Sequence, residues 1–400
     1  MNGRTWWQRA VARGYAPLPE PALSVTLVGP GHEATVRLPE QGLPGGFALP
    51  AGGLGVLLPT YVARCGPQAQ STALRHLLDA LVPVRRAHPD LPLTVWVGMQ
   101  YGSGERAEAV RRLRALTVLA PPAGATVVGI ALPGPGKPRT INAAVRLSRS
   151  LGYRGWLWTD DDVRFAGDCL ERLVTRFRER GWSGAVGSRV TTLSRATPAA
   201  RTMHRVSGTT VPPDAYPVAA CMVVATGVIA AGIPARRLAD DGHVLFELLD
   251  VAAADPLHDL EVLPDAVSLV HRPARARDTV RRLRRSLYSH TTCMADYPRP
   301  VAAHYFSAIL FHGLWPLARW DGSRGTRRGL VRWAVKAVHL GWLCAVAAGL
   351  AVRGAAGRPL RSVAWGDEGD FRSPVAGGPH PHEDSDGGDG GAAARRTAAG

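Results

Sequence analysis

Short apolar runs of strand length alternate with longer segments of helical periodicity through the first half of this 400-residue chain. The runs cover 54–58, 93–97, 126–130 and 155–159. Between the first two, over 71–86, one helical face collects apolar side chains, namely Leu74, Leu77, Leu78, Leu81 and Val82. Strands that are apolar throughout are typical of parallel sheets, because helices cover both faces of such sheets. The alternation predicts an α/β fold with an open, mostly parallel, twisted sheet flanked by helices.

The patterns outside this region are weaker. Two alternating runs, 24–28 and 34–38, predict a short strand pair, and the runs 260–264 and 266–270 predict two more short strands. An arginine-rich helix is expected over 279–288. We expect four parts: an N-terminal extension over 1–50, an α/β domain over 51–290, a C-terminal helical region over 291–355 and a disordered tail over 356–400.

The chain carries a net charge of +16, and nearly all of its positive charge is arginine, since lysine occurs only at Lys137 and Lys336. Such a basic chain suits anionic partners such as nucleotide phosphates or an anionic membrane surface. We expect no nucleic-acid partner, because the sequence has neither zinc-finger spacing nor an aromatic-rich RNA-binding signature. The five cysteines include no CxxC pair, which argues against a disulfide framework or a zinc site and fits the reducing cytosol.

The segment over 331–352 is mostly apolar and has the roughly 20-residue length of a membrane-spanning helix. Arg332, Lys336 and His339 interrupt it, so three alternatives stay open: a spanning helix, a helix on the membrane surface, or an amphipathic helix that packs on the protein. We expect a cytoplasmic protein that is either peripheral to the inner face of a bacterial cell membrane or anchored there by a single span.

Three consecutive carboxylates, Asp160, Asp161 and Asp162, follow the fourth apolar run directly. Adjacent like charges repel one another, and a divalent cation is a natural counter-ion because hard cations prefer oxygen ligands. Ligands of open α/β sheets bind at the carboxyl ends of strands, which is where this triplet is expected. The alternative is a solvated acidic turn. The triplet therefore predicts a metal-assisted site for a nucleotide diphosphate.

Four segments together resemble family 2 glycosyltransferases with the GT-A fold, in that family's order and over roughly residues 54–290. The first strand continues into Pro59-Thr60-Tyr61, and residues 136–144 resemble the family's Gly-Lys…Leu-Asn-Ala-Gly segment. The Asp triplet resembles the DXD motif, and Asp240-Asp241 resembles the Glu-Asp pair that supplies the catalytic base.

The resemblance implies metal-dependent, inverting transfer of a hexose or related sugar from a nucleotide donor, with UDP as the default, to a hydroxyl acceptor that is lipid-linked, a polysaccharide or a natural product. Asp162 and Asp160 would contact Mg²⁺ or Mn²⁺. Asp241 would be the general base, with Asp240 as the alternative, and helix capping would be the non-catalytic role of the pair. Donor contacts would come from Pro59, Tyr61, Gln100, Lys137, Asn142, Asp160, Asp161, Arg281 and Arg284.

Two positions depart from the family's pattern. Relatives carry Asp-Asp-Gly-Ser after the second strand, whereas this chain has Gln100 and Tyr101 before its Gly-Ser, and Arg285 stands where relatives have Trp. Two other functions therefore stay open. One is a degenerate glycosyltransferase-like scaffold at the membrane surface, and the other is a sugar-phosphate nucleotidyltransferase. The latter would need a glycine-rich loop after the first strand, where residues 59–64 contain no glycine.

Overall fold

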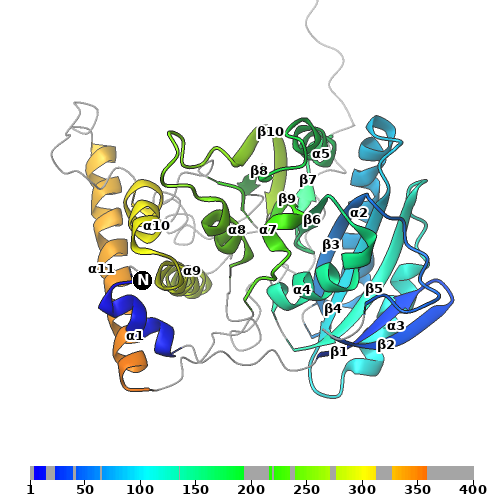
Figure 1. Ribbon diagram of the computed structural model, residues 1–400, viewed down its shortest axis with the longest axis horizontal. Coiled ribbons are helices and arrows are strands. Elements are labelled where there is room, and N and C mark those ends of the chain that lie inside the picture. Colours follow the sequence, from blue (N-terminus) through cyan, green and yellow to red (C-terminus); the bar gives the residue numbers. More distant parts are fainter. Residues whose placement is uncertain are drawn as a thin grey trace, which may run out of the picture.

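The computed structural model describes residues 4–14, 23–38, 42–63, 65–134, 136–192, 216–218, 220–234, 239–270, 276–311 and 327–357. A ten-stranded mixed sheet of order β2-β1-β5-β4-β3-β6-β9-β8-β10-β7 forms its centre (Figure 1). The strands predicted from the alternating region are neighbours and run parallel: β3 (Leu54–Tyr61), β4 (Leu93–Tyr101), β5 (Ala125–Pro133) and β6 (Gly155–Thr159). The other strands are β1 (Leu23–Gly29), β2 (His32–Leu38), β7 (Arg164–Phe165), β8 (Ala185–Thr192), β9 (Cys221–Ala225) and β10 (Leu260–Val270). The predicted α/β class with an open, mostly parallel sheet is confirmed.

Helices cover both faces of this sheet and create two cores. One core includes side chains from α2 (Pro67–Ala87), α3 (Arg106–Thr117) and α5 (Cys169–Glu179). The other includes side chains from α4 (Lys137–Leu147), α7 (Thr226–Ile229) and α8 (Asp240–Leu248), and the short turn η1 (Arg149–Leu151) adjoins it. In β3, Val56 and Leu58 belong to the first core and Leu57 to the second, because successive side chains of a strand point to opposite faces.

Tryptophan dominates the centre of the second core. The Trp156 side chain is 1% exposed, and its ring centroid lies 6.2 Å from that of Trp96 and 5.4 Å from that of Tyr153. The Trp156 ring also covers Gly55 of the neighbouring strand, where an added Cβ would come within 2.6 Å of a ring carbon. Glycine at this position therefore permits the close approach of ring and backbone.

Three local expectations differ from the structure. The predicted strand pair is not separate from the main sheet, because β1 pairs antiparallel with β5. The two short strands expected over 260–270 are one strand, β10, whose register shifts between Leu263 and Val267, beside a proline that cannot donate to the ladder. Lys137, expected in a loop, is the first residue of α4, since the proline that follows it suits a first helical turn.

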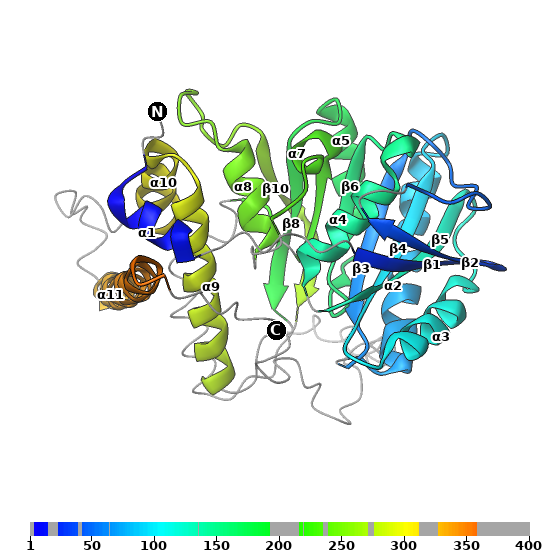
Figure 2. The same cartoon turned by 60° about the horizontal axis from the view of Figure 1, so that its bottom comes forward.

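A second group of helices lies beside the sheet (Figures 1 and 2). Its members are α1 (Trp6–Gly14), α9 (Ala276–Asp296), α10 (Arg299–His304), the π-helical turn η2 (Tyr305–Leu310) and α11 (Arg327–Ala355). The N-terminal helix α1 packs on both α9 and α11. Gln8 Nε2 donates to the carbonyl oxygens of Met294 and Tyr297 at 2.8 and 3.0 Å. The first residues of the chain therefore complete the C-terminal helical region.

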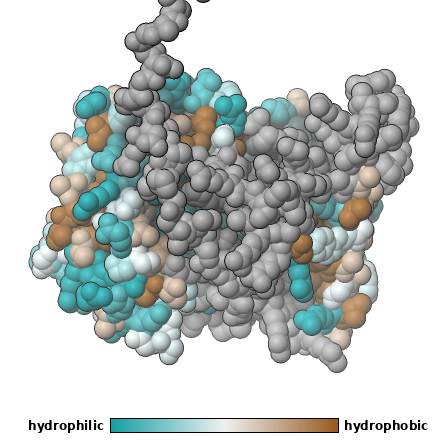
Figure 3. All heavy atoms as spheres, turned by 180° about the vertical axis from the view of Figure 1, so that it is seen from behind, coloured by the Kyte–Doolittle hydropathy of each residue, from teal (hydrophilic) through white to brown (hydrophobic). Residues whose placement is uncertain are grey.

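Within the described part of the chain, α11 has the length and composition of a membrane span over Ala337–Ala355, with a mean hydropathy of 1.4. Core helices of soluble proteins can have the same length and composition, but they are mostly buried, whereas 28% of this window is buried, including Leu343 and Leu350. Hydrophilic and hydrophobic residues are interspersed on the coloured parts of the face shown in Figure 3. The membrane location stays a prediction.

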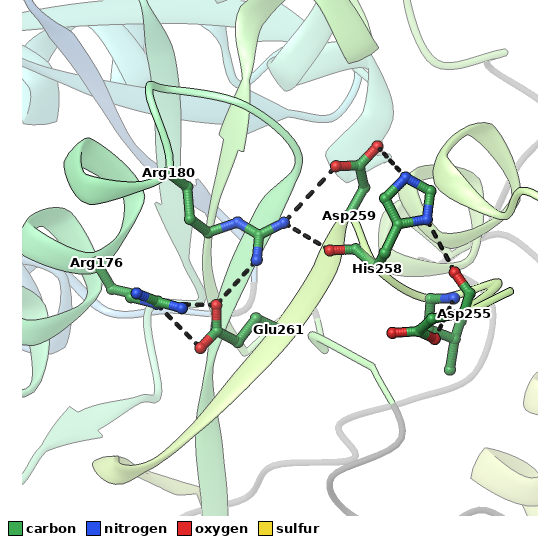
Figure 4. Close-up of polar contacts among 7 residues, drawn as sticks. Arg176, Arg180, Asp255, His258, Asp259 and Glu261 are labelled. Atoms are coloured by element: carbon green, nitrogen blue, oxygen red, sulfur yellow. Dashed lines mark hydrogen bonds and ion pairs between the residues drawn. The ribbon is translucent and has the colours of Figure 1, made fainter. Parts of the chain in front are cut away.

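Arginine–carboxylate pairs join α5 to β10 (Figure 4). Arg176 Nε lies 3.0 Å from both carboxylate oxygens of Glu261, and Arg180 Nη1 lies 3.0 Å from one of them. Arg180 Nη2 also donates to the carbonyl oxygen of His258 at 2.7 Å. Because these ion pairs are partly exposed, they add little to the stability of the fold. Their main effect is to orient α5 relative to β10.

The contact between α9 and η2 gives a prediction for acid conditions. Tyr305 Oη lies 2.5 Å from His290 Nδ1, and burial lowers the pKa of His290 to about 4. Because an unfolded histidine titrates near pH 6.5, the unfolded chain binds this proton first, and the contribution of His290 to stability is expected to decline between about pH 6.5 and pH 4. His290→Asn keeps a polar partner for Tyr305 and does not titrate. We expect it to make the decline shallower by up to about 1.4 kcal/mol per pH unit.

Urea unfolding of both proteins at several pH values between about 7 and 4.5 would measure this slope. The exposed His32 provides the matched control, and His32→Asn should leave the slope unchanged. Equal slopes for His290→Asn and the wild type would contradict the prediction.

Candidate functional site

The carboxyl ends of β3, β4, β5 and β6 lie together at one edge of the sheet. Tyr61 ends β3, Gln100 is the penultimate residue of β4, and Asp160 follows β6 directly. Lys137 starts the helix that follows β5. The parallel strand order therefore gathers at one edge several residues that are distant in the sequence, at the position where ligands of such sheets bind.

Lys137 is the centre of a buried ion cluster. Its Nζ donates to Asp160 Oδ1 at 2.9 Å and lies 3.1 Å from Asp240 Oδ2. The side chains of Lys137 and Asp240 are 8% and 4% exposed, and that of Asp160 is 21% exposed. Burial alone would lower the pKa of Lys137, but the two carboxylates outweigh burial and raise the pKa, so the ammonium stays charged. Lys137 is therefore not an exposed loop cation.

The two adjacent aspartates of α8 have different surroundings. Asp240 is buried against Lys137, and burial, together with the nearby carboxylates of Asp241 and Asp160, raises the pKa of Asp240 to about 6. Asp241 is partly exposed, and its Oδ1 accepts a hydrogen bond from the Gly242 N–H at 2.7 Å. Asp241 is therefore the more accessible of the two carboxylates, whereas Asp240 is buried in the ion cluster with Lys137.

The remaining carboxylates of the triplet are partly exposed. The Cys65 thiol donates to Asp161 Oδ2 at 3.0 Å, which links the loop after β3 to the end of β6. Arg112 Nη1 donates to the carbonyl oxygen of Cys65 at 2.7 Å and holds this loop from α3. Cys65 is not predicted as a site residue, because nothing in the local sequence indicates its contact with a residue so far along the chain. Asp162, next to Asp161, is also partly exposed.

Two amide side chains predicted to contact the donor make hydrogen bonds within the protein. Gln100 Oε1 accepts a hydrogen bond from the Gly136 N–H at 2.8 Å, and its Nε2 donates to Thr140 Oγ1 at 2.6 Å. Asn142 exchanges two hydrogen bonds of 2.7 Å with the N–H and carbonyl of Ile233. Gln100 thus fixes the start of α4 to β4, and Asn142 fixes α4 to the segment after α7. Their predicted donor contacts have no further support in these positions.

The other predicted donor residues belong to β3 and α9. Pro59 is buried within β3 opposite Gly98, and Tyr61 is partly exposed at the strand's end. Arg284 is exposed on α9, which packs against α8. The backbone of Arg281 lies in α9, and its side chain is outside the described residues. Contacts of these residues with a donor stay predictions.

A metal ion at this edge would depend on few protein ligands. Within the described residues, no group of three or more His, Cys, Asp or Glu side chains is arranged to hold a metal. Mg²⁺ is commonly bound by one or two carboxylates together with substrate phosphates and water, so a full protein cage is not needed. The partly exposed carboxylates at the end of β6 fit that chemistry, and metal contacts of Asp162 and Asp160 stay predictions.

No protein-family model matches the sequence, and no curated protein matches it. Among solved structures, the chain is similar to mannosyltransferase PcManGT from Pyrobaculum calidifontis in complex with GDP-Man and Mn²⁺, with 18% identity, 78% of this chain and 83% of that chain covered, and a TM-score of 0.41. It is also similar to TarS of S. aureus, with 11% identity, coverage of 76% and 55%, and a TM-score of 0.37. A mycobacterial protein matches with 16% identity, coverage of 60% and 75%, and a TM-score of 0.34.

Proposed function

We propose that this protein is a metal-dependent, inverting glycosyltransferase that moves a sugar from a nucleotide-diphosphate donor to a hydroxyl acceptor. The observation that carries the proposal is the ion cluster of Lys137, which brings Asp160 of the acidic triplet next to the Asp240-Asp241 pair. The first motif suits a diphosphate and the second suits a general base, and a transferase needs both at one place. A scaffold would have no need for this arrangement.

In the proposed reaction, the residues of the site have separate roles. Asp241 accepts the proton of the acceptor hydroxyl while that oxygen attacks the anomeric carbon from the face opposite the diphosphate. The bond between the anomeric carbon and the diphosphate oxygen breaks, and the diphosphate leaves with the electron pair. Asp160 and Asp162 lie on the donor side. Asp160 and Asp162 would hold Mg²⁺ or Mn²⁺, which would neutralise the charge of the leaving diphosphate.

Arginine is suited to the same leaving group, because its guanidinium forms paired hydrogen bonds with phosphate oxygens. Arg281 and Arg284 belong to α9 beside α8, and we assign them to the diphosphate or to an anionic membrane surface. The apolar α11 and the net charge of +16 favour an acceptor at the cytoplasmic membrane face, such as a lipid-linked saccharide.

The first test is calorimetric binding of UDP, GDP, CDP and dTDP, with and without Mn²⁺. We expect one nucleotide to bind in a metal-dependent manner, and Asp162→Ala to weaken that binding by at least about tenfold. Asp90→Ala is the matched control, because Asp90 is an exposed carboxylate that pairs with Arg178 before the start of β4, at the opposite edge of the sheet. Binding of no nucleotide would instead support the scaffold function.

A further inference from the structure

The position of Lys137 is unusual for a cation. It is the first residue of α4, and the positive end of a helix dipole disfavours a positive charge there. The side chain is also buried, at 8% exposure, and it lies between carboxylates from two other elements. One ammonium between two carboxylates compensates part of their charge, and it would be costly to bury without them. The three groups therefore stabilise one another's positions.

The cluster joins the two halves of the proposed site. Asp160 follows β6 and lies on the donor side, whereas Asp240 begins α8. Asp241 is the next residue along α8, so its Cα lies about 3.8 Å from that of Asp240. A change in the position of Asp240 would therefore move the proposed base. In Figures 1 and 2, α8 lies between the sheet and α9. The ion pair between Lys137 and Asp240 links the start of α8 to the start of α4.

We propose that Lys137 is a positioning residue that tethers the start of α8 to the end of β6 and so fixes Asp241 relative to the sugar donor. This inference rests on the proposed function for the roles of Asp160 and Asp241. It gives Lys137 a task other than direct contact with the donor phosphate. The tether also gives a reason for a lysine at this position in a chain whose cations are almost all arginine, since a compact ammonium fits between two carboxylates in a buried space.

The test compares full-length Lys137→Met, Lys137→Arg and Asp240→Asn with the wild type. Lys137→Met keeps most of the aliphatic stem and removes the charge, Lys137→Arg keeps the charge, and Asp240→Asn removes the other end of the tether without a change of size. The measurements are amide hydrogen exchange across α8, calorimetry with the nucleotide selected above and Mn²⁺, and the kcat and KM for slow hydrolysis of the corresponding nucleotide sugar.

A tether predicts that Lys137→Met and Asp240→Asn each accelerate exchange in α8 by about tenfold or more, with α2 unchanged as the internal control. Nucleotide affinity and KM should stay within about threefold while kcat falls by about tenfold or more, and Lys137→Arg should recover part of kcat. The double variant Lys137→Met/Asp240→Asn should be little worse than either single variant, because both break the same link.

The opposite pattern would overturn the tether. If Lys137→Met weakened nucleotide binding by about tenfold or more and left exchange in α8 unchanged, Lys137 would instead be a donor ligand. Unchanged α8 exchange in Asp240→Asn would contradict the tether even if Lys137→Met failed to fold. A wild type that binds no nucleotide would refute the proposed function alone, because hydrogen exchange still reports on the link between α8 and β6.

Discussion

Asp241→Asn should bind the nucleotide and Mn²⁺ as tightly as the wild type and should transfer sugar about 10² to 10⁴ times more slowly. Asparagine has nearly the size of aspartate, and its carbonyl oxygen can still accept the Gly242 N–H that Oδ1 accepts in the wild type. The amide cannot take a proton from the acceptor hydroxyl at neutral pH. The loss is therefore expected in kcat, which release of free UDP or another nucleotide diphosphate from its sugar donor would measure.

The variant Asp240→Asn tests which of the two adjacent aspartates is the general base. It should reduce kcat by a smaller factor than Asp241→Asn, because Asp240 acts on the position of the base and is itself buried against Lys137. A larger loss in Asp240→Asn than in Asp241→Asn would show that the two residues have been assigned the wrong way round. Full activity in both variants would refute the site.

Trp156→Ala is expected to reduce the free energy of unfolding by about 3 to 5 kcal/mol. The side chain is 1% exposed and fills the space between the rings of Trp96 and Tyr153. The bare backbone of Gly55 lies beneath the ring and offers no side chain to fill the resulting cavity. Urea unfolding at constant pH, followed by circular dichroism, would measure the change.

Trp6→Ala provides the matched control for this loss. Trp6 is 66% exposed on α1, so the same truncation should change stability by no more than about 0.5 kcal/mol. Similar losses in the two variants would mean that Trp156 is not a central contact of the second core.

The sequence allowed prediction of those strands whose burial on both faces leaves a continuous apolar run, such as β6 at Gly155–Thr159. It did not indicate β8, because that strand contains Gly187-Ser188-Arg189 and reads as polar. In the fold, Ser188 is 1% exposed, and its hydroxyl donates to Ser268 Oγ on β10 at 2.7 Å. Local hydropathy does not reveal that a serine is buried and that its hydroxyl forms a hydrogen bond with a neighbouring strand.

The candidate site likewise contains local motifs that the sequence reveals and long-range contacts that it does not. The acidic triplet and the Asp240-Asp241 pair could be found because each is a local motif. The link of Lys137 to both motifs, and that of Cys65 to Asp161, depend on which strand ends become neighbours, which local sequence does not determine. The hydrogen bonds of Gln100 to Gly136 and Thr140 likewise follow from the pairing of β4 with β5.

The packing of α1 on α9 and α11 has a consequence for the order in which the chain folds. The neighbouring strands β3 to β6 draw their contacts from residues 54–159, so this part of the sheet can assemble while the ribosome is still adding later residues. The helix α1 leaves the ribosome before these strands, but the carbonyls that accept hydrogen bonds from Gln8 belong to Met294 and Tyr297. The surface of α1 that packs on α9 and α11 can dock only after residues up to about 355 have been synthesised, which makes docking of α1 a late step in folding.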